Sequence, residues 1–439
     1  MADRTATRRK VPTARRRLPA GRTAAAAASG RPHLRLVRPG DAIAPARDAA
    51  AAARRDLALL LVPTLMLTVI GLVMVLSAGS ISAVEGYGTS FWYFNRQAIY
   101  AIVGVVGMLV AARTPYALWR RAALPLLAIV VPVMLLTLHG SIGSSLYGAA
   151  RWIDLGPITL QPAELAKPLV LFAAAAILTR PGKDVTRPRD VILPLVPVVA
   201  IVAGVMLLQR DLGTTLILCG SVFLLAFAAG VPLRYLATTL LVSAPVVAYF
   251  IFGTTYRRTR FLEAWLNWEL DPSGAGWQLR QGLIALGSGG WFGVGLGNSR
   301  QKWEYLPNAH SDFVFAVLGE ELGLVGALVV LILFGLLLAA GVRIAVRSTD
   351  PFGRLIAAGV TGWIGLQTLV NLGAVTGLLP ITGVPLPFLS FGGTALVVTL
   401  AGVGVVASVA RTTARRVADD AGAHPPRRRR EPVRAMAGR

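Results

Sequence analysis

The chain has few charges and almost no cysteine, and each shortage excludes a class of protein. Only 15% of its 439 residues are Asp, Glu, Lys or Arg, whereas 55% are hydrophobic. That balance excludes an ordinary soluble globule and is typical of a polytopic membrane protein. The single cysteine, Cys219, lies in an apolar run, so neither an intrachain disulfide nor a thiolate metal cluster is available. The sequence also lacks an internal repeat, a P-loop and a dinucleotide-binding fingerprint.

Apolar runs long enough to cross a bilayer, roughly 20 residues each, dominate the chain. They predict an all-α fold with about ten transmembrane helices. We place the spans near residues 57–79, 97–113, 122–139, 162–179, 191–208, 212–230, 232–252, 313–342, 356–379 and 390–410. The short basic loops fall on the same side as both tails, so the positive-inside rule predicts two cytoplasmic termini. The longest connection, about 253–312 between the seventh and eighth spans, is then a large extracytoplasmic loop.

Two basic tails flank the predicted membrane domain at 56–410. Residues 1–55 hold fourteen Lys and Arg against three Asp, and residues 411–439 hold nine Arg against three acids. Both lack helical apolar periodicity, which predicts disordered cytoplasmic segments. No aromatic residues are interleaved with the arginines, so we expect attraction to anionic lipid headgroups and no nucleic-acid partner.

Ionisable residues gather where the long outer loop enters the eighth span. Lys302, His310 and Asp312 lie at its mouth, and Glu320 and Glu321 lie within it. Charged groups at membrane depth are costly and mark functional sites. Asp312 can serve as a general base that takes a proton from an attacking hydroxyl, and the alternative is an Asp that only caps the following helix.

Other polar residues are expected to support the bundle. Glu320 and Glu321 lie roughly 12 Å below Asp312 at 1.5 Å per helical residue, well inside the predicted span. We expect them to bind Lys167, Arg210 or a backbone break.

Two further patterns concern helix pairing and helix breaks. Glu164 and Lys167 are spaced to pair on one helical face, which leaves Lys167 balanced between a structural role and substrate contact. Asn371 and Ser390 frame a Pro- and Gly-rich discontinuity, a feature that occurs where backbone faces a cavity.

Two segments of the long outer loop carry predictions of their own. The sequence RFLEAWLNWEL has Phe261, Trp265 and Trp268 at helical spacing, which predicts an amphipathic interfacial helix. The glycines from Gly287 to Gly297 predict a backbone turn able to approach a phosphate closely.

Five segments, in order along the chain, carry a family resemblance. They are GAARWIDLGPITLQPAELAK (148–167), QRDLGTTL (209–216), YRRTRF (256–261), GSGGWFGVGLGNSRQKWEYLPNAHSDFVFAVLGEELGLVG (287–326) and NLGAVTGLLPITGVPLPFLSFGGTAL (371–396). On these motifs the chain resembles the SEDS family (shape, elongation, division, sporulation) over about residues 57–410. The segment GTSFWYFNRQ and the long basic tail favour its FtsW-like branch over the RodA-like branch.

The resemblance implies a peptidoglycan glycosyltransferase in the bacterial cytoplasmic membrane. Such an enzyme polymerises lipid II at the outer face, here at the division septum, beside a class B penicillin-binding protein and other divisome proteins. Asp312 becomes the expected catalytic residue, and one direct displacement predicts inversion at the anomeric carbon. Cations, or a divalent metal such as Mg²⁺ or Mn²⁺, would ease departure of the pyrophosphate. The candidate substrate-binding residues are Arg151, Trp152, Lys167, Arg210, Arg258, Lys302 and His310.

One departure from the family pattern bears on a metal. Asn308 stands where the LPEAH motif has Glu, which puts in doubt a two-carboxylate metal site near Asp312. A lipid II flippase, a non-catalytic divisome scaffold and a RodA-like lateral-wall polymerase are the competing functions. Polar residues concentrate on one membrane face rather than along a path through the midplane, which favours surface chemistry over transport.

Overall fold

The computed structural model describes residues 43–139, 143–146, 149–156, 158–253, 258, 265–266, 276–303 and 305–422. Its helices are α1 (Ile43–Tyr87), α2 (Trp92–Arg113), α3 (Ala117–Leu136), α4 (Pro162–Leu178), α5 (Pro188–Leu208), α6 (Leu212–Ala228), α7 (Leu233–Phe252), α9 (Trp277–Ser288), α10 (Val314–Arg347), α11 (Pro351–Val375) and α12 (Gly393–Gly422). Strands β1 (Gly143–Leu146), β2 (Ala149–Asp154) and β3 (Thr159–Leu160) form an antiparallel sheet in that order.

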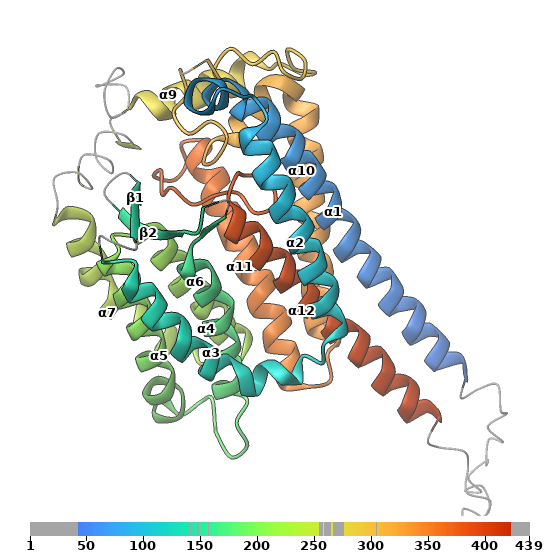
Figure 1. Cartoon of the computed structure of the whole chain (residues 1–439). Coiled ribbons are helices and arrows are strands. Elements are labelled where there is room, and N and C mark those ends of the chain that lie inside the picture. The colour runs from blue at the N-terminus through green and yellow to red at the C-terminus, as the bar shows by residue number, and fades with distance from the viewer. Residues whose placement is uncertain are drawn as a thin grey trace, which may run out of the picture.

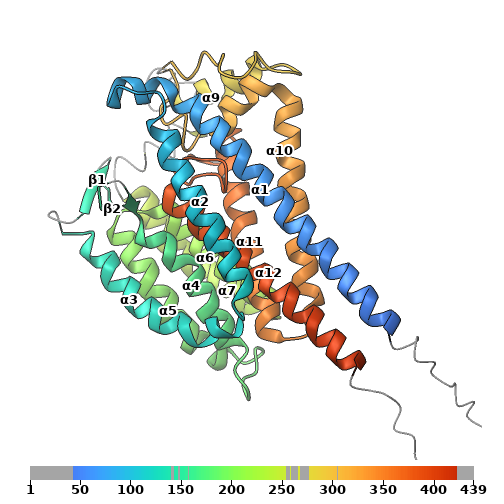
Figure 2. The same ribbon diagram turned by 45° about the vertical axis from the view of Figure 1, so that its right-hand side comes forward.

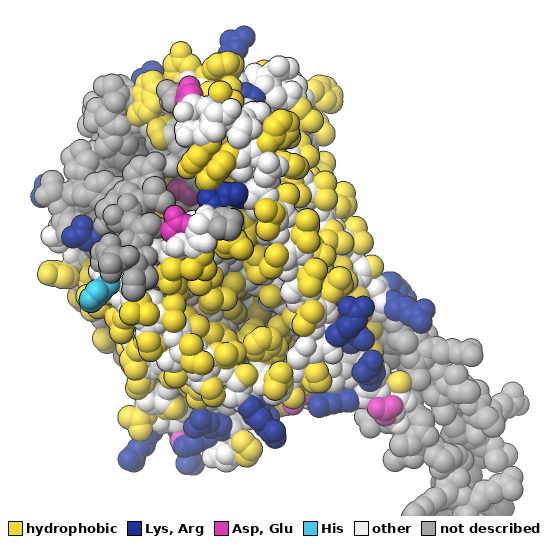
Figure 3. Space-filling model, viewed as in Figure 1, with side chains coloured by type: hydrophobic (Ala, Val, Ile, Leu, Met, Phe, Trp, Pro, Cys, Tyr) yellow, Lys and Arg dark blue, Asp and Glu magenta, His cyan; other side chains and the backbone are white. Residues whose placement is uncertain are grey.

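The all-α membrane fold is confirmed. Each of the ten predicted spans overlaps one helix of the bundle. Within the described residues, eight helices are long and apolar enough to cross a membrane, and α4 and α6 are shorter, with 17 residues each. Hydrophobic side chains cover the middle of the molecule, and Lys and Arg side chains gather toward its lower end (Figure 3).

The helices differ in how deeply they lie in the bundle. Helices α4, α11 and α12 are largely buried, with α11 contacting α4, α6, α10 and α12 (Figure 1). Helix α7 lies at the periphery, where Leu236 is its one buried side chain. Helices α2 and α12 pack closely because a Cβ at Gly104 or Gly404 would collide with the partner helix, the small-residue contact typical of membrane helices.

Both ends of the described chain lie at the same end of the bundle. The start of α1, the end of α12 and the loop joining α4 to α5 lie there, and α9 lies at the opposite end (Figures 1 and 2). Asp56 of α1 pairs with Arg343, at 3.1 Å, and with Arg347, both near the end of α10. The arrangement agrees with the predicted topology, in which the two tails share one side.

Several predicted boundaries are wrong. Helix α1 begins at Ile43 and α12 continues to Gly422, so both enter segments predicted to be disordered. The Ala-rich start of α1 extends the spanning helix without needing an apolar face, because Ala has the highest helix propensity. The small sheet and α9 were not predicted. The amphipathic helix expected around Trp265 lies almost entirely outside the described residues.

Candidate active site

Asp312 lies where the outer loop ends and α10 begins. Phe313 occupies the N-cap position of α10, so Asp312 lies one residue before the cap. Its side chain is half-buried. A Cβ added to Gly383 would lie 3.6 Å from the Asp312 Oδ2 atom. The carboxylate therefore faces the irregular segment 376–392 between α11 and α12, a discontinuity that the Pro and Gly residues correctly predicted.

Asn371 of α11 joins these two non-helical segments. Its Nδ2 donates a hydrogen bond to the Asp312 carbonyl at 3.0 Å and another to the Val384 carbonyl at 2.8 Å. The side chain is buried, so the two bonds position the backbone that carries the carboxylate. A second link is the Phe391 N–H, which donates to the His310 carbonyl at 3.0 Å.

His310 lies in an aromatic cluster beside Asp312. Its ring stacks on Tyr93 of α2, with centroids 4.2 Å apart, and meets Phe391 edge-on at 5.7 Å. Burial lowers the pKa of His310 to about 4, because desolvation disfavours the charged ring. The ring is thus neutral at physiological pH and cannot supply a fixed positive charge for a pyrophosphate.

Arg151 and Arg210 meet at a second cluster. Arg151 of β2 pairs with Asp211 at 3.4 Å, and its guanidinium lies 5.8 Å from the centroid of the Trp152 ring. Asp211 caps α6 by accepting from the Thr214 N–H at 3.1 Å. The Arg210 side chain is exposed and forms no ion pair with another described residue, so its charge is available to a ligand.

The two clusters share the segment around Gly383. A Cβ at Gly213 in the first turn of α6 would lie 2.5 Å from the Thr382 carbonyl oxygen, and the Asp312 carboxylate faces Gly383. The first turn of α6, which begins just after Arg210, and the Asp312 side chain therefore both lie against residues 382 and 383. Arg258 is exposed, but its neighbours in sequence are not described.

Lys167 is buried beneath this segment instead of lying at the surface. Its Nζ pairs with Glu164 at 2.8 Å, as the helical spacing predicted, and donates to Gln367 Oε1 at 3.1 Å. Gln367 in turn donates to the Pro385 carbonyl at 2.9 Å. The substrate contact considered for Lys167 has no geometric support, since the group lies 1% exposed in a structural network. Sequence reasoning missed Gln367.

Ser390 and Gln97 hold the other end of the segment. The Ser390 hydroxyl accepts from the Leu386 N–H at 2.8 Å, and Gln97 of α2 donates to the Ser390 carbonyl at 3.1 Å. The predicted structural role of Ser390 is thus visible, whereas Gln97 had no signal in the sequence beyond being polar inside a span.

Helix α10 is broken seven to ten residues into the span, and the glycine-rich loop fills the break. Gly323 has a φ of 68°, which is not helical. The carbonyls of Glu320 and Glu321 accept from Val294 and Gly295, and the N–H groups of α10 after the break bond to loop carbonyls at 290 and 291. The predicted close approach of this glycine turn is therefore to the α10 backbone, and the break at Gly323 was not predicted.

Glu320 and Glu321 hold the same loop through their side chains. Glu320 accepts from the Ser299 hydroxyl and from the Arg300 N–H at 2.9 Å. Glu321 accepts from Ser77 of α1 at 2.6 Å and lies 3.7 Å from Lys302 Nζ. Neither side chain pairs with Lys167 or Arg210, the side-chain partners expected from sequence; both hold the loop at 299–302 instead. Lys302, 6% exposed, is thus part of this support and not an open substrate-binding cation.

Among the described residues, the surroundings of Asp312 show no cluster of side chains suited to hold a metal ion. Across the described parts of the chain, no group of three His, Cys, Asp or Glu side chains could hold a metal ion. Two pockets in the described chain lie away from Asp312: one is a void of about 10 Å³ beneath the segment, and the other lies at the opposite end. The Mg²⁺ or Mn²⁺ expected from sequence stays a prediction, and no step below depends on it.

Fold and site together define a class: a polytopic membrane protein with one carboxylate at an outer loop–helix junction, between two broken helices. The sequence matches the FtsW/RodA/SpoVE family, described as cell cycle proteins, over residues 57–415. The chain belongs to this family, the one that the motifs indicated as SEDS.

Curated relatives and solved structures agree with this membership. A protein named probable peptidoglycan glycosyltransferase FtsW, from Geobacter metallireducens, is 42% identical and covers 81% of this chain and 94% of its own length. Stage V sporulation protein E of Bacillus subtilis is 37% identical, and the match covers 80% of this chain and 96% of that protein.

Among structures, one chain is 30% identical with a TM-score of 0.65, covering 81% of this chain and 97% of its own length. It comes from a study titled "Structural coordination of polymerization and crosslinking by a peptidoglycan synthase complex". The rod shape determining protein RodA of Thermus thermophilus is also 30% identical, with a TM-score of 0.59. The match covers 80% of this chain and 95% of the RodA chain.

Proposed function

We propose that this chain is a peptidoglycan glycosyltransferase that polymerises lipid II, with Asp312 as its general base. The observation that carries the proposal is the half-buried Asp312 carboxylate, whose backbone Asn371 fixes at the outer edge of the bundle. Membership of a family whose relatives are named peptidoglycan glycosyltransferases supports the substrate class.

The reaction joins an acceptor hydroxyl to an anomeric carbon. Asp312 takes the hydroxyl proton as the new oxygen–carbon bond forms, while the bond to the undecaprenyl pyrophosphate breaks. Because one base serves a single displacement, the configuration at the carbon inverts. Arg210 lies three residues before Gly213, which packs on the stretch that Asp312 faces. Its exposed guanidinium, which forms no ion pair with another described residue, is the group we assign to stabilise the departing pyrophosphate. Arg151, already paired with Asp211, supplies less charge and acts with Trp152 as a sugar-contacting pair.

We infer a class B penicillin-binding protein as partner and the division septum as the place of action. A neighbouring structure comes from a complex that couples polymerization to crosslinking, and the FtsW-named relatives are more similar in sequence than RodA. Other divisome proteins are expected to accompany the pair.

The test is polymerisation of labelled lipid II by the purified full chain with its partner. Asp312→Asn should remove glycan strand formation, and Thr368→Val, which alters a buried hydrogen bond within α11, should leave it intact. Normal strand synthesis by Asp312→Asn would refute the assignment. Translocation of labelled lipid II without strand formation by the native chain would instead favour a flippase.

A further inference from the structure

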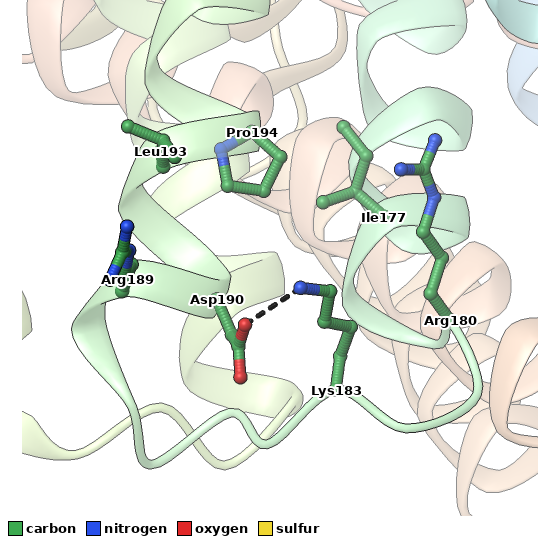
Figure 4. Close-up of a pocket in the computed structure, with 7 residues that line it drawn as sticks. All are labelled: Ile177, Arg180, Lys183, Arg189, Asp190, Leu193 and Pro194. Atoms are coloured by element: carbon green, nitrogen blue, oxygen red, sulfur yellow. Dashed lines mark hydrogen bonds and ion pairs between the residues drawn. The ribbon is translucent and has the colours of Figure 1, made fainter.

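A second candidate binding site lies at the end of the bundle opposite Asp312. A pocket of about 190 Å³ opens between the end of α4 and the start of α5 (Figure 4). It is lined by Ile177, Arg180, Lys183, Arg189, Asp190, Leu193 and Pro194. The loop that joins the two helices lies on the side of the chain termini (Figure 1), which the topology places at the cytoplasmic leaflet.

The pocket carries a net positive charge. Lys183 and Asp190 pair at 2.8 Å (Figure 4), so this acid is already used. Arg180 comes from the α4 side and Arg189 from the α5 side, and neither forms an ion pair with another described residue. Pro188 and Arg189 open α5, whose N-terminal end adds the positive pole of a helix dipole.

Apolar surface adjoins these cations on the membrane side. Leu193 is 68% exposed and Ile192 is 43% exposed, one turn into α5. Only 28% of the most apolar stretch of α5 is buried by the rest of the chain, so the helix presents this face to acyl chains. A soluble phosphate would leave that face unused, whereas a phospholipid satisfies the cations and the apolar face together.

We propose that this pocket binds the headgroup phosphate of an anionic phospholipid of the inner leaflet, with its acyl chains along α5. Two cations without acidic partners favour a lipid whose headgroup carries a net negative charge over a zwitterionic lipid. Each basic residue near the membrane surface strengthens the attraction to such a lipid. The site is separate from the lipid II reaction and does not depend on it.

The test measures lipid retained by the purified full chain in phosphatidylcholine nanodiscs that contain a minor fraction of phosphatidylglycerol. The variant Arg180→Gln/Lys183→Gln/Arg189→Gln should retain about tenfold less phosphatidylglycerol than the native chain, as quantified by mass spectrometry. Asp190→Asn should retain more, a gain that misfolding cannot produce.

A matched control removes three exposed cations outside the pocket, with Arg113→Gln, Arg121→Gln and Arg415→Gln. Retention close to native in this control supports a directed site, and an equal loss in both triple variants would overturn it in favour of general surface attraction. Glycerol 1-phosphate should displace the lipid poorly. Displacement at equal concentration would reject the lipid and identify a soluble phosphate ligand, and no enrichment of phosphatidylglycerol by the native chain would reject the site.

Discussion

Asn371 offers the sharpest test of how the bundle positions its carboxylate. The substitution Asn371→Leu keeps the branched shape and the number of side-chain heavy atoms but removes the two hydrogen bonds to the carbonyls of Asp312 and Val384. Asn371 is 2% exposed, so water cannot readily replace them. The loop and the irregular segment would separate at the point where Asp312 faces Gly383.

The magnitude follows from the two carbonyls left without a donor. Each buried unsatisfied group costs about 1–3 kcal/mol, so the variant loses roughly 2–6 kcal/mol before relaxation. If about 3 kcal/mol of this appears as misplacement of the base in the transition state, polymerisation falls by roughly 100-fold. The loss should appear in kcat and not in KM, because Asn371 reaches only backbone and not the substrate.

The assay compares lipid II polymerisation and thermal unfolding for three variants. Thr368→Val, one turn earlier on α11, loses a buried bond to the Ile364 carbonyl and should retain native activity. Asp312→Asn, which loses the carboxylate but keeps the Asn371 bonds to the backbone, sets the background rate. A rate for Asn371→Leu within twofold of native, in a folded protein, would refute the positioning role.

Three other predictions concern stability in detergent. Gly293→Ala should lower the unfolding temperature strongly, because its Cβ would collide with the α10 backbone. The control Gly297→Ala lies at a similar φ of 80° in open space and should lower the free energy of unfolding by only about 1–2 kcal/mol. An equal loss of stability in the two variants would contradict the packing of the loop on α10. Lys167→Met leaves Glu164 buried without its cation and should lower the free energy of unfolding by about 3–5 kcal/mol. Adding Glu164→Leu should restore most of this stability. A double variant no more stable than Lys167→Met would contradict the prediction. His310 has a folded pKa lowered from 6.5 to about 4, so its contribution is fully present above about pH 6.5 and lost as pH falls toward 4, by at most about 3 kcal/mol. His310→Phe should therefore flatten the dependence of unfolding temperature on pH in that window, and an unchanged slope would contradict it.

The features predicted from sequence are those with a local cause. A spanning helix requires a run of apolar residues, so each of the ten predicted spans coincides with a helix, and eight of the described helices are long and apolar enough to cross a membrane. The Glu164–Lys167 pair follows from spacing along one helix, and Pro380, Pro385 and Pro387 predict the irregular segment because proline cannot continue a helix.

The features that were missed depend on contacts between distant segments. Asn371 reaches a carbonyl 59 positions away, and Glu321 reaches Ser77 across 244 positions, and no periodicity records either contact. The break at Gly323 is stabilised by backbone groups of the 289–295 loop, which leave no side-chain signature. Glu320 and Glu321 could be marked as important from their depth, but their partners could not be chosen.

The distribution of buried charge favours surface chemistry over transport. Within the described chain, Lys302 pairs with Glu321, Lys167 with Glu164 and Asp56 with Arg343. A transport route needs polar groups that a moving substrate can engage near the midplane, whereas these groups are each engaged by protein. Two of the pairs support the loop before Asp312 or the segment that faces it. The buried polar groups therefore hold the outer loop and the irregular segment in place, as the proposed polymerase requires if Asp312 is to keep its position through successive additions.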